Sequence, residues 1–213
     1  MRHILVINPK GGSGKSTVAT NLAAHYAHKV DDVALVDFDS QASSLDWLER
    51  RSERYPEIVG LAGFEDGMRG VNRGTDIVII DAPARTHKTE LTDLVNRAET
   101  IVIPVQPSPI DMDATAKFLD ELSHYKKIKE KKVKVGLVAN RFRENTLVWD
   151  KLDEFLEKQK PPYIAAFREA QNYIRAYTRG LGINELPEYL AWPDQQQWEP
   201  LIEWLDSKRS QPK

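Results

Sequence analysis

Short runs rich in valine and isoleucine recur along the chain and alternate with longer segments of helical periodicity. Most of these runs are apolar at successive positions, as expected of strands that are buried between two layers of helices. The segments predicted to be strands are residues 4–8, 33–37, 77–81, 101–105 and 133–140.

Apolar residues between these runs recur every three or four positions, which predicts helices that turn one face toward a sheet. Repeated strand–helix units imply parallel strands joined by right-handed crossovers. We therefore predict an α/β fold, a doubly wound and mostly parallel sheet with helices on both faces. The predicted helical rows are Val18, Leu22 and Tyr26 within 15–28, then Ala114, Phe118, Leu122 and Tyr125, then Val148, Leu152 and Phe155.

The 213 residues fit a single domain, 1–213, with one substantial core. Its last part, 185–213, has a different character because prolines interrupt it and tryptophans cluster there. Since large aromatic side chains mostly serve burial, we expect this part to pack onto the domain through a helix near 200–208. The tryptophans concerned are Trp192, Trp198 and Trp204.

Composition limits the chemistry. The chain has 41% hydrophobic and 29% charged residues, as soluble globular proteins do, and it lacks a run long enough to span a membrane. It has no cysteine, which excludes disulfides, thiolate zinc sites, iron–sulfur clusters and cysteine nucleophiles. Because the net charge is −2, binding to nucleic acid would need a local basic patch.

The stretch NPKGGSGKST, residues 8–17, lies between the first predicted strand and the first predicted helix. In that position a glycine-rich loop holds polyphosphate through its backbone amides and the positive end of the helix. The strict GxxxxGK[ST] pattern lacks its first glycine, which is Pro9 here. The loop residues expected to hold the nucleotide are Gly11, Gly12, Ser13, Gly14, Lys15 at the β- and γ-phosphates, Ser16 at Mg²⁺ and Thr17 at the α-phosphate.

With Lys10 in place, KGGSGKST resembles the deviant Walker A motif of the ParA/MinD class of P-loop NTPases. Four later segments resemble further motifs of that family, in the family's order. They are VALVDFDSQ, IVIIDAPA, VIPVQPSPIDMDA and VANRF. Because the sequence opens directly on its first predicted strand, it resembles the small ParA type.

This resemblance implies an ATP hydrolase that uses ATP and Mg²⁺. Asp81 would hold the water shell of the metal, Asn140 would contact adenine, and Asp39 would orient the attacking water. Asp37 would support the metal or that water, or would only cap the turn that follows it.

Lys10 supplies a second positive charge at the mouth of the loop. Taken alone, it is consistent with a surface lysine. The resemblance implies instead a homodimer in which two protomers face each other across their nucleotides and Lys10 acts on the partner's transferring phosphoryl group. The dimer would then depend on ATP, and hydrolysis would stay slow until a partner protein completes the site.

ParA-like proteins bind DNA without sequence preference and position a cargo. The resemblance implies a cytoplasmic, nucleoid-associated protein whose cargo is a plasmid, a chromosome or a large assembly such as a carboxysome. A ParB-like or adaptor partner on that cargo would stimulate hydrolysis. Candidate phosphate contacts are the lysine run 126–134 and a row expected on one face of a helix within 167–182, namely Arg168, Arg175 and Arg179.

Two other classes remain as alternatives. A MinD-like membrane-positioning ATPase needs a basic amphipathic helix at its C-terminus. Here WEPLIEWLDSKRSQPK places Glu199, Glu203 and Asp206 among the apolar residues, so we expect no membrane partner. A metabolic P-loop ligase or synthase needs a further substrate pocket, for which the sequence offers no candidate groups.

Overall fold

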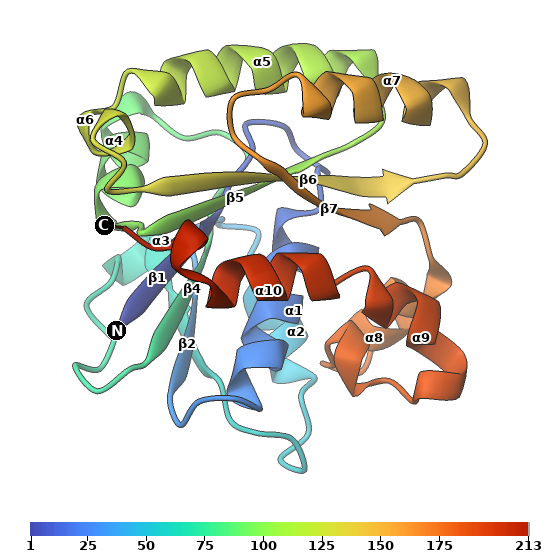
Figure 1. Cartoon of the computed structure of the whole chain (residues 1–213). Helices are drawn as coiled ribbons and strands as arrows, with labels where there is room; N and C mark the ends of the chain where they lie inside the picture. The colour runs from blue at the N-terminus through green and yellow to red at the C-terminus, as the bar shows by residue number, and fades with distance from the viewer. Residues whose placement is uncertain (213) are drawn as a thin grey trace.

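Seven strands form one sheet in the order β3-β2-β4-β1-β5-β6-β7, and every neighbouring pair is parallel (Figure 1). The computed structural model describes residues 1–212. The predicted doubly wound α/β fold is confirmed. The strands are β1 Arg2–Val6, β2 Val33–Asp37, β3 Val59–Ala62, β4 Ile77–Asp81, β5 Thr100–Val105, β6 Lys134–Phe142 and β7 Tyr163–Arg168.

Helices cover both faces of this sheet (Figure 1). The helices α1, α2, α8, α9 and α10 share one core with the strands, and α4, α5 and α7 share the other. Their bounds are α1 Lys15–Ala27, α2 Ser43–Glu49, α3 Gly63–Asp66, α4 Lys88–Arg97, α5 Pro109–Ser123, α6 Lys126–Lys129, α7 Leu147–Glu157, α8 Gln171–Tyr177, α9 Glu188–Gln196 and α10 Glu199–Asp206, with short 3-10 turns η1 Ile183–Glu185 and η2 Lys208–Ser210.

Each central strand is apolar on both faces because both faces are covered. In β1, Ile4 and Val6 belong to the core beneath α1, whereas Leu5 lies in the opposite core. Their side chains are fully buried. Because every strand pair is parallel, the carboxyl ends of all the strands, and the loops that follow them, lie at the same edge of the sheet.

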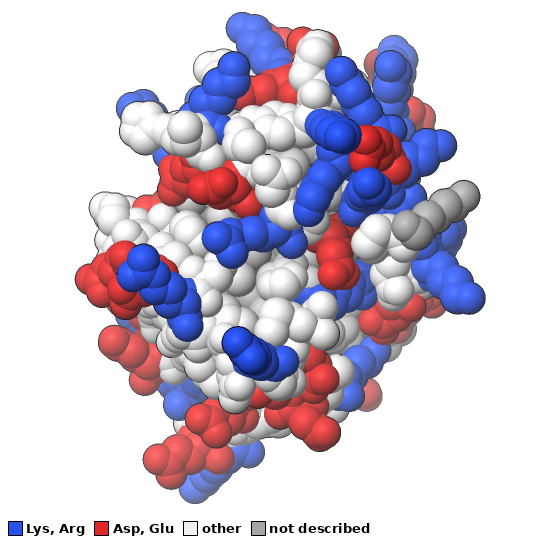
Figure 2. Space-filling model, turned by 90° about the vertical axis from the view of Figure 1, so that its left-hand side faces the viewer, with Lys and Arg blue, Asp and Glu red and all other residues white. Residues whose placement is uncertain are grey.

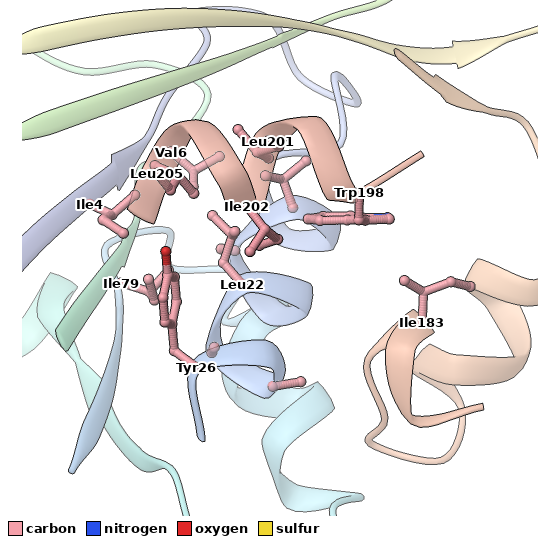
Figure 3. Close-up of a cluster of buried hydrophobic side chains, with 14 of the residues drawn as sticks. Ile4, Val6, Leu22, Tyr26, Ile79, Ile183, Trp198, Leu201, Ile202 and Leu205 are labelled. Atoms are coloured by element: carbon pink, nitrogen blue, oxygen red, sulfur yellow. The ribbon is translucent and has the colours of Figure 1, made fainter. Parts of the chain in front are cut away.

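The helix α10 packs its apolar face onto α1 and the sheet (Figure 3). Leu201 and Leu205 are fully buried, and Trp198 and Trp204 are 1% and 4% exposed. Trp192 differs, because it stays 55% exposed on α9, so the prediction that this tryptophan packs onto the domain is wrong. Among residues 1–212, no helix has both the length and the apolar character needed to cross a membrane.

The predicted helical row of three arginines is also wrong. Arg168 ends β7, whose ladder with β6 extends to the pair Phe142 and Arg168, and the helix α8 begins only at Gln171. Arg175 lies within α8, while Arg179 follows its end. Strand pairing therefore takes the first arginine out of the helix, and the three side chains do not share one helical face.

Candidate functional site

The loop that joins β1 to α1 lies at the carboxyl edge of the sheet, where parallel α/β folds bind their ligands. Gly14 has a φ of +91°, a conformation that strains any other residue. A Cβ on Gly14 would also lie 2.0 Å from Nδ2 of Asn140, which donates to the main-chain oxygen of Ser13 at 2.8 Å. The end of β6 thus holds the loop directly and requires a glycine there.

Two amide side chains fix the rest of the loop. Asn8 is fully buried, donates through Nδ2 to the main-chain oxygen of Pro104 at 2.8 Å and accepts from the amide of Lys10 at 2.8 Å. Gln106 donates through Nε2 to the main-chain oxygen of Gly12 at 2.6 Å. The loop is therefore anchored to the end of β5 at two points.

The two lysines of the loop are linked. Lys15 is 6% exposed, and its Nζ donates to the main-chain oxygen of Lys10 at 3.1 Å. Burial lowers the pKa of Lys15, while the nearby carboxylates Asp81 and Asp39 oppose that shift. Lys15 thus lies between the loop and two of the predicted acidic residues.

Asp81 is buried at the end of β4 with one oxygen unpaired. Its Oδ2 accepts a hydrogen bond from the hydroxyl of Ser44, whereas its Oδ1 is buried without a partner. Burial, and next the charge of Asp37, raises the pKa of Asp81 to about 7, while the hydrogen bond from Ser44, the nearby Ser16 hydroxyl and the charge of Lys15 oppose that rise. A cation or its water shell would satisfy the unpaired oxygen, so the residues present fit a magnesium site.

Asp37 ends β2 in register with Asp81 on β4. Its Oδ1 accepts from the amide of Asp39 and its Oδ2 from the amide of Ser44, both at 2.9 Å. Burial raises the pKa of Asp37, and these amide bonds oppose the rise. Asp37 is expected either to support the metal or water or to cap the turn, and these two contacts are those of a residue that caps the turn. They also position Asp39. Asp39 is half-buried, and its Oδ1 accepts from the amide of Gln41 at 3.0 Å.

A cavity of about 300 Å³ opens beside the loop. Thr17 in the first turn of α1 and Asn140 line it on one side, and the β7–α8 connection lines it on the other, with arginines at its border. In size it suits a nucleobase next to the phosphate loop. No three histidine, aspartate or glutamate side chains gather as a metal cage within residues 1–212, so water and phosphate would have to complete the coordination of a metal at the predicted residues Ser16, Asp37 and Asp81.

Sequence reasoning missed three residues of this site. The role of Asn8 could have been predicted, because an asparagine side chain often accepts a hydrogen bond from the backbone amide two residues later in the chain. Ser44 and Gln106 carry none, since their partners Asp81 and Gly12 are distant in the sequence.

The three candidate arginines lie in different environments. Arg168 donates through Nε to the fully buried Asp194 at 2.5 Å. Arg175 and Arg179 are exposed. The lysine run lies on α6 and at the start of β6, at the edge of the sheet opposite the loop. Figure 2 looks onto the side that carries α6, and lysine and arginine side chains gather in its upper right part.

Residues 4–183 match the family described as the CobQ/CobB/MinD/ParA nucleotide binding domain. The maintenance of carboxysome distribution protein A of Gloeobacter kilaueensis is 35% identical over 120 residues, which are 52% of this chain and 52% of that protein. The protein of the same name from Halothiobacillus neapolitanus is 25% identical over 189 residues, 86% of this chain and 87% of its own. The chromosome-partitioning ATPase Soj of Thermus thermophilus is 32% identical over 154 residues, 57% of this chain and 61% of its own.

Solved structures show the same fold. Apo McdA from Cyanthece superposes with a TM-score of 0.77 at 16% identity, covering 96% of this chain and 99% of that one. The septum site-determining protein MinD of Pyrococcus horikoshii, solved with Mg-ADP, gives 0.69 at 17% identity over 97% and 96%.

The close contact at Gly14 yields a first prediction. Gly14→Ala forces a positive φ, worth about 1–3 kcal/mol of strain, and also drives the new methyl group into Asn140. We expect at least about a tenfold loss in binding of a fluorescent ATP analogue, together with a lower free energy of unfolding. Gly12→Ala is the matched control, because its φ is +79° but no atom lies within 4 Å of the added carbon. Equal losses in the two variants would contradict a special role for the Asn140 contact.

The raised pKa of Asp81 yields a second prediction, for protein free of nucleotide and magnesium. Between the usual aspartate pKa and about 7, folded Asp81 holds a proton that the unfolded chain has released. Stability therefore falls as pH rises through this window. We expect Asp81→Asn to flatten that fall and to raise the free energy of unfolding at pH 8 by at least about 1 kcal/mol. Urea titrations across pH measure this, with exposed Asp120→Asn as the control; an unchanged slope in Asp81→Asn would contradict the assignment.

Proposed function

Because the chain belongs to the CobQ/CobB/MinD/ParA nucleotide-binding family, we propose that it is a ParA-type ATPase that forms an ATP-dependent homodimer and positions a cargo. We propose a single ATPase domain over 1–213, with 185–213 as the segment that packs on it. The relatives reported above, named for carboxysome distribution and for chromosome partitioning, support this function class.

The observation that carries the proposal is the arrangement of Lys10. Its main chain is fixed at both ends, since its amide donates to Asn8 and its carbonyl accepts from Lys15. Its ammonium group makes no hydrogen bond or ion pair within residues 1–212, although it lies at the mouth of the phosphate loop. A lysine whose main chain is fixed and whose ammonium group has no partner in its own chain suits a contact with the nucleotide of a second protomer.

Each remaining residue takes a role in the proposed site. The loop 11–14 and Lys15 bind the phosphates of ATP, Thr17 bonds the α-phosphate, and the cavity beside Asn140 takes the adenine. Ser16 and Asp81 hold Mg²⁺ or its water shell, and the metal supplies neutralisation of phosphate charge. Asp39 orients the attacking water, and Asp37 fixes the turn that carries Asp39. The partner's copy of Lys10 neutralises charge on the transferring phosphoryl group.

We propose that the ATP-bound dimer binds DNA without sequence preference, which would make the protein cytoplasmic and nucleoid-associated. Arg175 and Arg179 are the proposed contacts, because they are exposed near the same edge of the sheet as the nucleotide site. Arg168 is already paired with Asp194, and the lysine run lies at the opposite edge. The cargo would be a plasmid, a chromosome or a large assembly such as a carboxysome, and a ParB-like or adaptor protein on it would stimulate slow hydrolysis.

The shared site makes a prediction for Lys10. ATP with Mg²⁺ should convert monomer to dimer in sedimentation, and Lys10→Ala should keep ATP binding while hydrolysis falls by at least about tenfold. The reason is that the ammonium group contacts the partner's phosphates and not those of its own nucleotide. Lys160→Ala, which removes an exposed lysine at the opposite edge, is the control and should change neither measurement. A wild-type rate of ATP hydrolysis in Lys10→Ala would show that Lys10 is only a surface charge.

The DNA proposal predicts binding to duplexes of unrelated sequence that requires ATP and weakens steeply with salt. Arg175→Ala/Arg179→Ala should weaken binding and reduce the slope of log K against log salt by about 4 per dimer, about one for each of the two arginines lost from each protomer. The comparison variant is Lys129→Ala/Lys131→Ala, which removes two lysines of the run. If that variant loses DNA binding and the arginine variant does not, the contact surface lies at the other edge. Binding to anionic liposomes in place of DNA would favour the MinD-like alternative.

A further inference from the structure

Two large aromatic side chains are exposed side by side on α9. Tyr189 is 92% exposed and Trp192 is 55% exposed. Residues three apart on a helix are neighbours on its surface, so the two rings form one patch. Tryptophan and tyrosine are the side chains most enriched at the energetic centres of protein interfaces. The patch has no role in the nucleotide site, which lies at the loop after β1.

A groove of about 580 Å³ opens beside Trp192, between α9, α10 and α1. The edges of Leu186, Trp198 and Ile202 form its apolar floor. Figure 3 shows Ile202 on the face of α10 that packs toward α1, and Trp198 directly before the start of that helix. Trp198 stacks on Phe167 with ring centroids 4.3 Å apart and an angle of 11° between the planes, so this floor is fixed by the core.

The rim of the groove is acidic. Glu188, Glu199 and Glu203 line it, and no lysine or arginine does. Glu188 and Glu203 form no ion pair within residues 1–212, and the side chain of Glu199 accepts only from the side-chain Nε2 of Gln196, at 2.6 Å. The one basic side chain in the lining is His25, and burial lowers the pKa of His25 to about 4, which leaves it neutral at physiological pH.

We propose that this groove docks a segment of a partner protein that carries lysine or arginine next to an apolar side chain. The three carboxylates would pair with the basic residues, Trp192 would stack on one of them, and the floor would take the apolar group. The identification of this partner as the cargo-bound protein that stimulates hydrolysis rests on the proposed function. The docking chemistry is independent of that function.

The position of the groove connects it to the nucleotide site. His25 lines the groove on α1, and the same helix begins at Lys15 with the phosphate loop. A segment seated against α1 therefore contacts the element that carries the loop. This placement fits a partner that acts on hydrolysis without entering the nucleotide site.

The test is fluorescence anisotropy of a labelled arginine–leucine peptide with the nucleotide-free full chain. The same peptide with glutamate at every arginine position is the second probe. The arginine peptide should bind and the glutamate peptide should not. Trp192→Ala and Glu188→Lys/Glu203→Lys should each weaken binding by about tenfold or more, as expected for residues central to an interface.

Matched controls keep this test specific. Phe64→Ala removes a 39% exposed aromatic side chain from α3, and Glu157→Lys reverses an exposed charge on α7, so both should leave binding unchanged. Far-ultraviolet circular dichroism checks that each variant folds. Because no nucleotide is present, this result is independent of whether ATP drives dimerisation.

Three outcomes would overturn the proposal. Equal binding of both peptides would show that the groove does not select positive charge. Binding that survives both groove variants would place the contact elsewhere. Self-association of the free chain that Trp192→Ala abolishes would show that a second copy of the chain covers this face.

Discussion

Two buried carboxylates end neighbouring strands in register. Burying two such groups side by side costs free energy, and the contacts of the site offset that cost. Asp37 on β2 lies opposite Asp81 on β4, and burial raises the pKa of each. The two carboxylates differ in the hydrogen bonds that they accept. Asp37 accepts amide hydrogen bonds on both oxygens, while Asp81 accepts one from Ser44 and keeps a buried oxygen unpaired. An unsatisfied buried carboxylate oxygen costs stability, and a nearby cation removes that cost. This unpaired oxygen is the feature that supports the proposed role of Asp81 at a magnesium ion.

Hydrogen bonds connect this acidic pair to the rest of the site. Ser44 contacts Asp81 through its hydroxyl and Asp37 through its amide, so it links the turn that carries Asp39 to the proposed metal-binding residue Asp81. Lys15 reaches the carbonyl of Lys10 and so ties the proposed trans-acting residue to the phosphate loop. Because such networks respond as units, a change at one member is expected to reach the others. The proposed docking groove adds a second route, since it contacts the helix α1 that begins at the loop.

The sequence predicted the buried elements well and the surface elements poorly. Five strands were visible because apolar residues follow one another where both faces are covered. β3 is short, contains Gly60 and lies at an edge, where its residues need not be apolar on both sides. The helix α9 was missed because Pro193 lies inside it. Among the site residues, the loop and the acids follow from local motifs, whereas the contact of Ser44 with Asp81 arises only from folding. The arginine row failed because strand pairing at β7 overrode helical spacing.

The central claim is that one nucleotide site needs residues from two chains, and complementation between two inactive variants tests it most directly. Lys10→Ala lacks the residue given to the partner, and Asp39→Ala lacks the residue used on its own nucleotide. In a mixed dimer, the site of the Lys10→Ala chain has its own Asp39 and receives Lys10 from the other chain. Mixing the two variants at equal concentration with ATP and Mg²⁺ should restore up to about a quarter of the wild-type ATPase rate, since half of the dimers are mixed and one of their two sites is complete. A mixture as inactive as its separate components, although sedimentation shows that mixed dimers form, would contradict the claim.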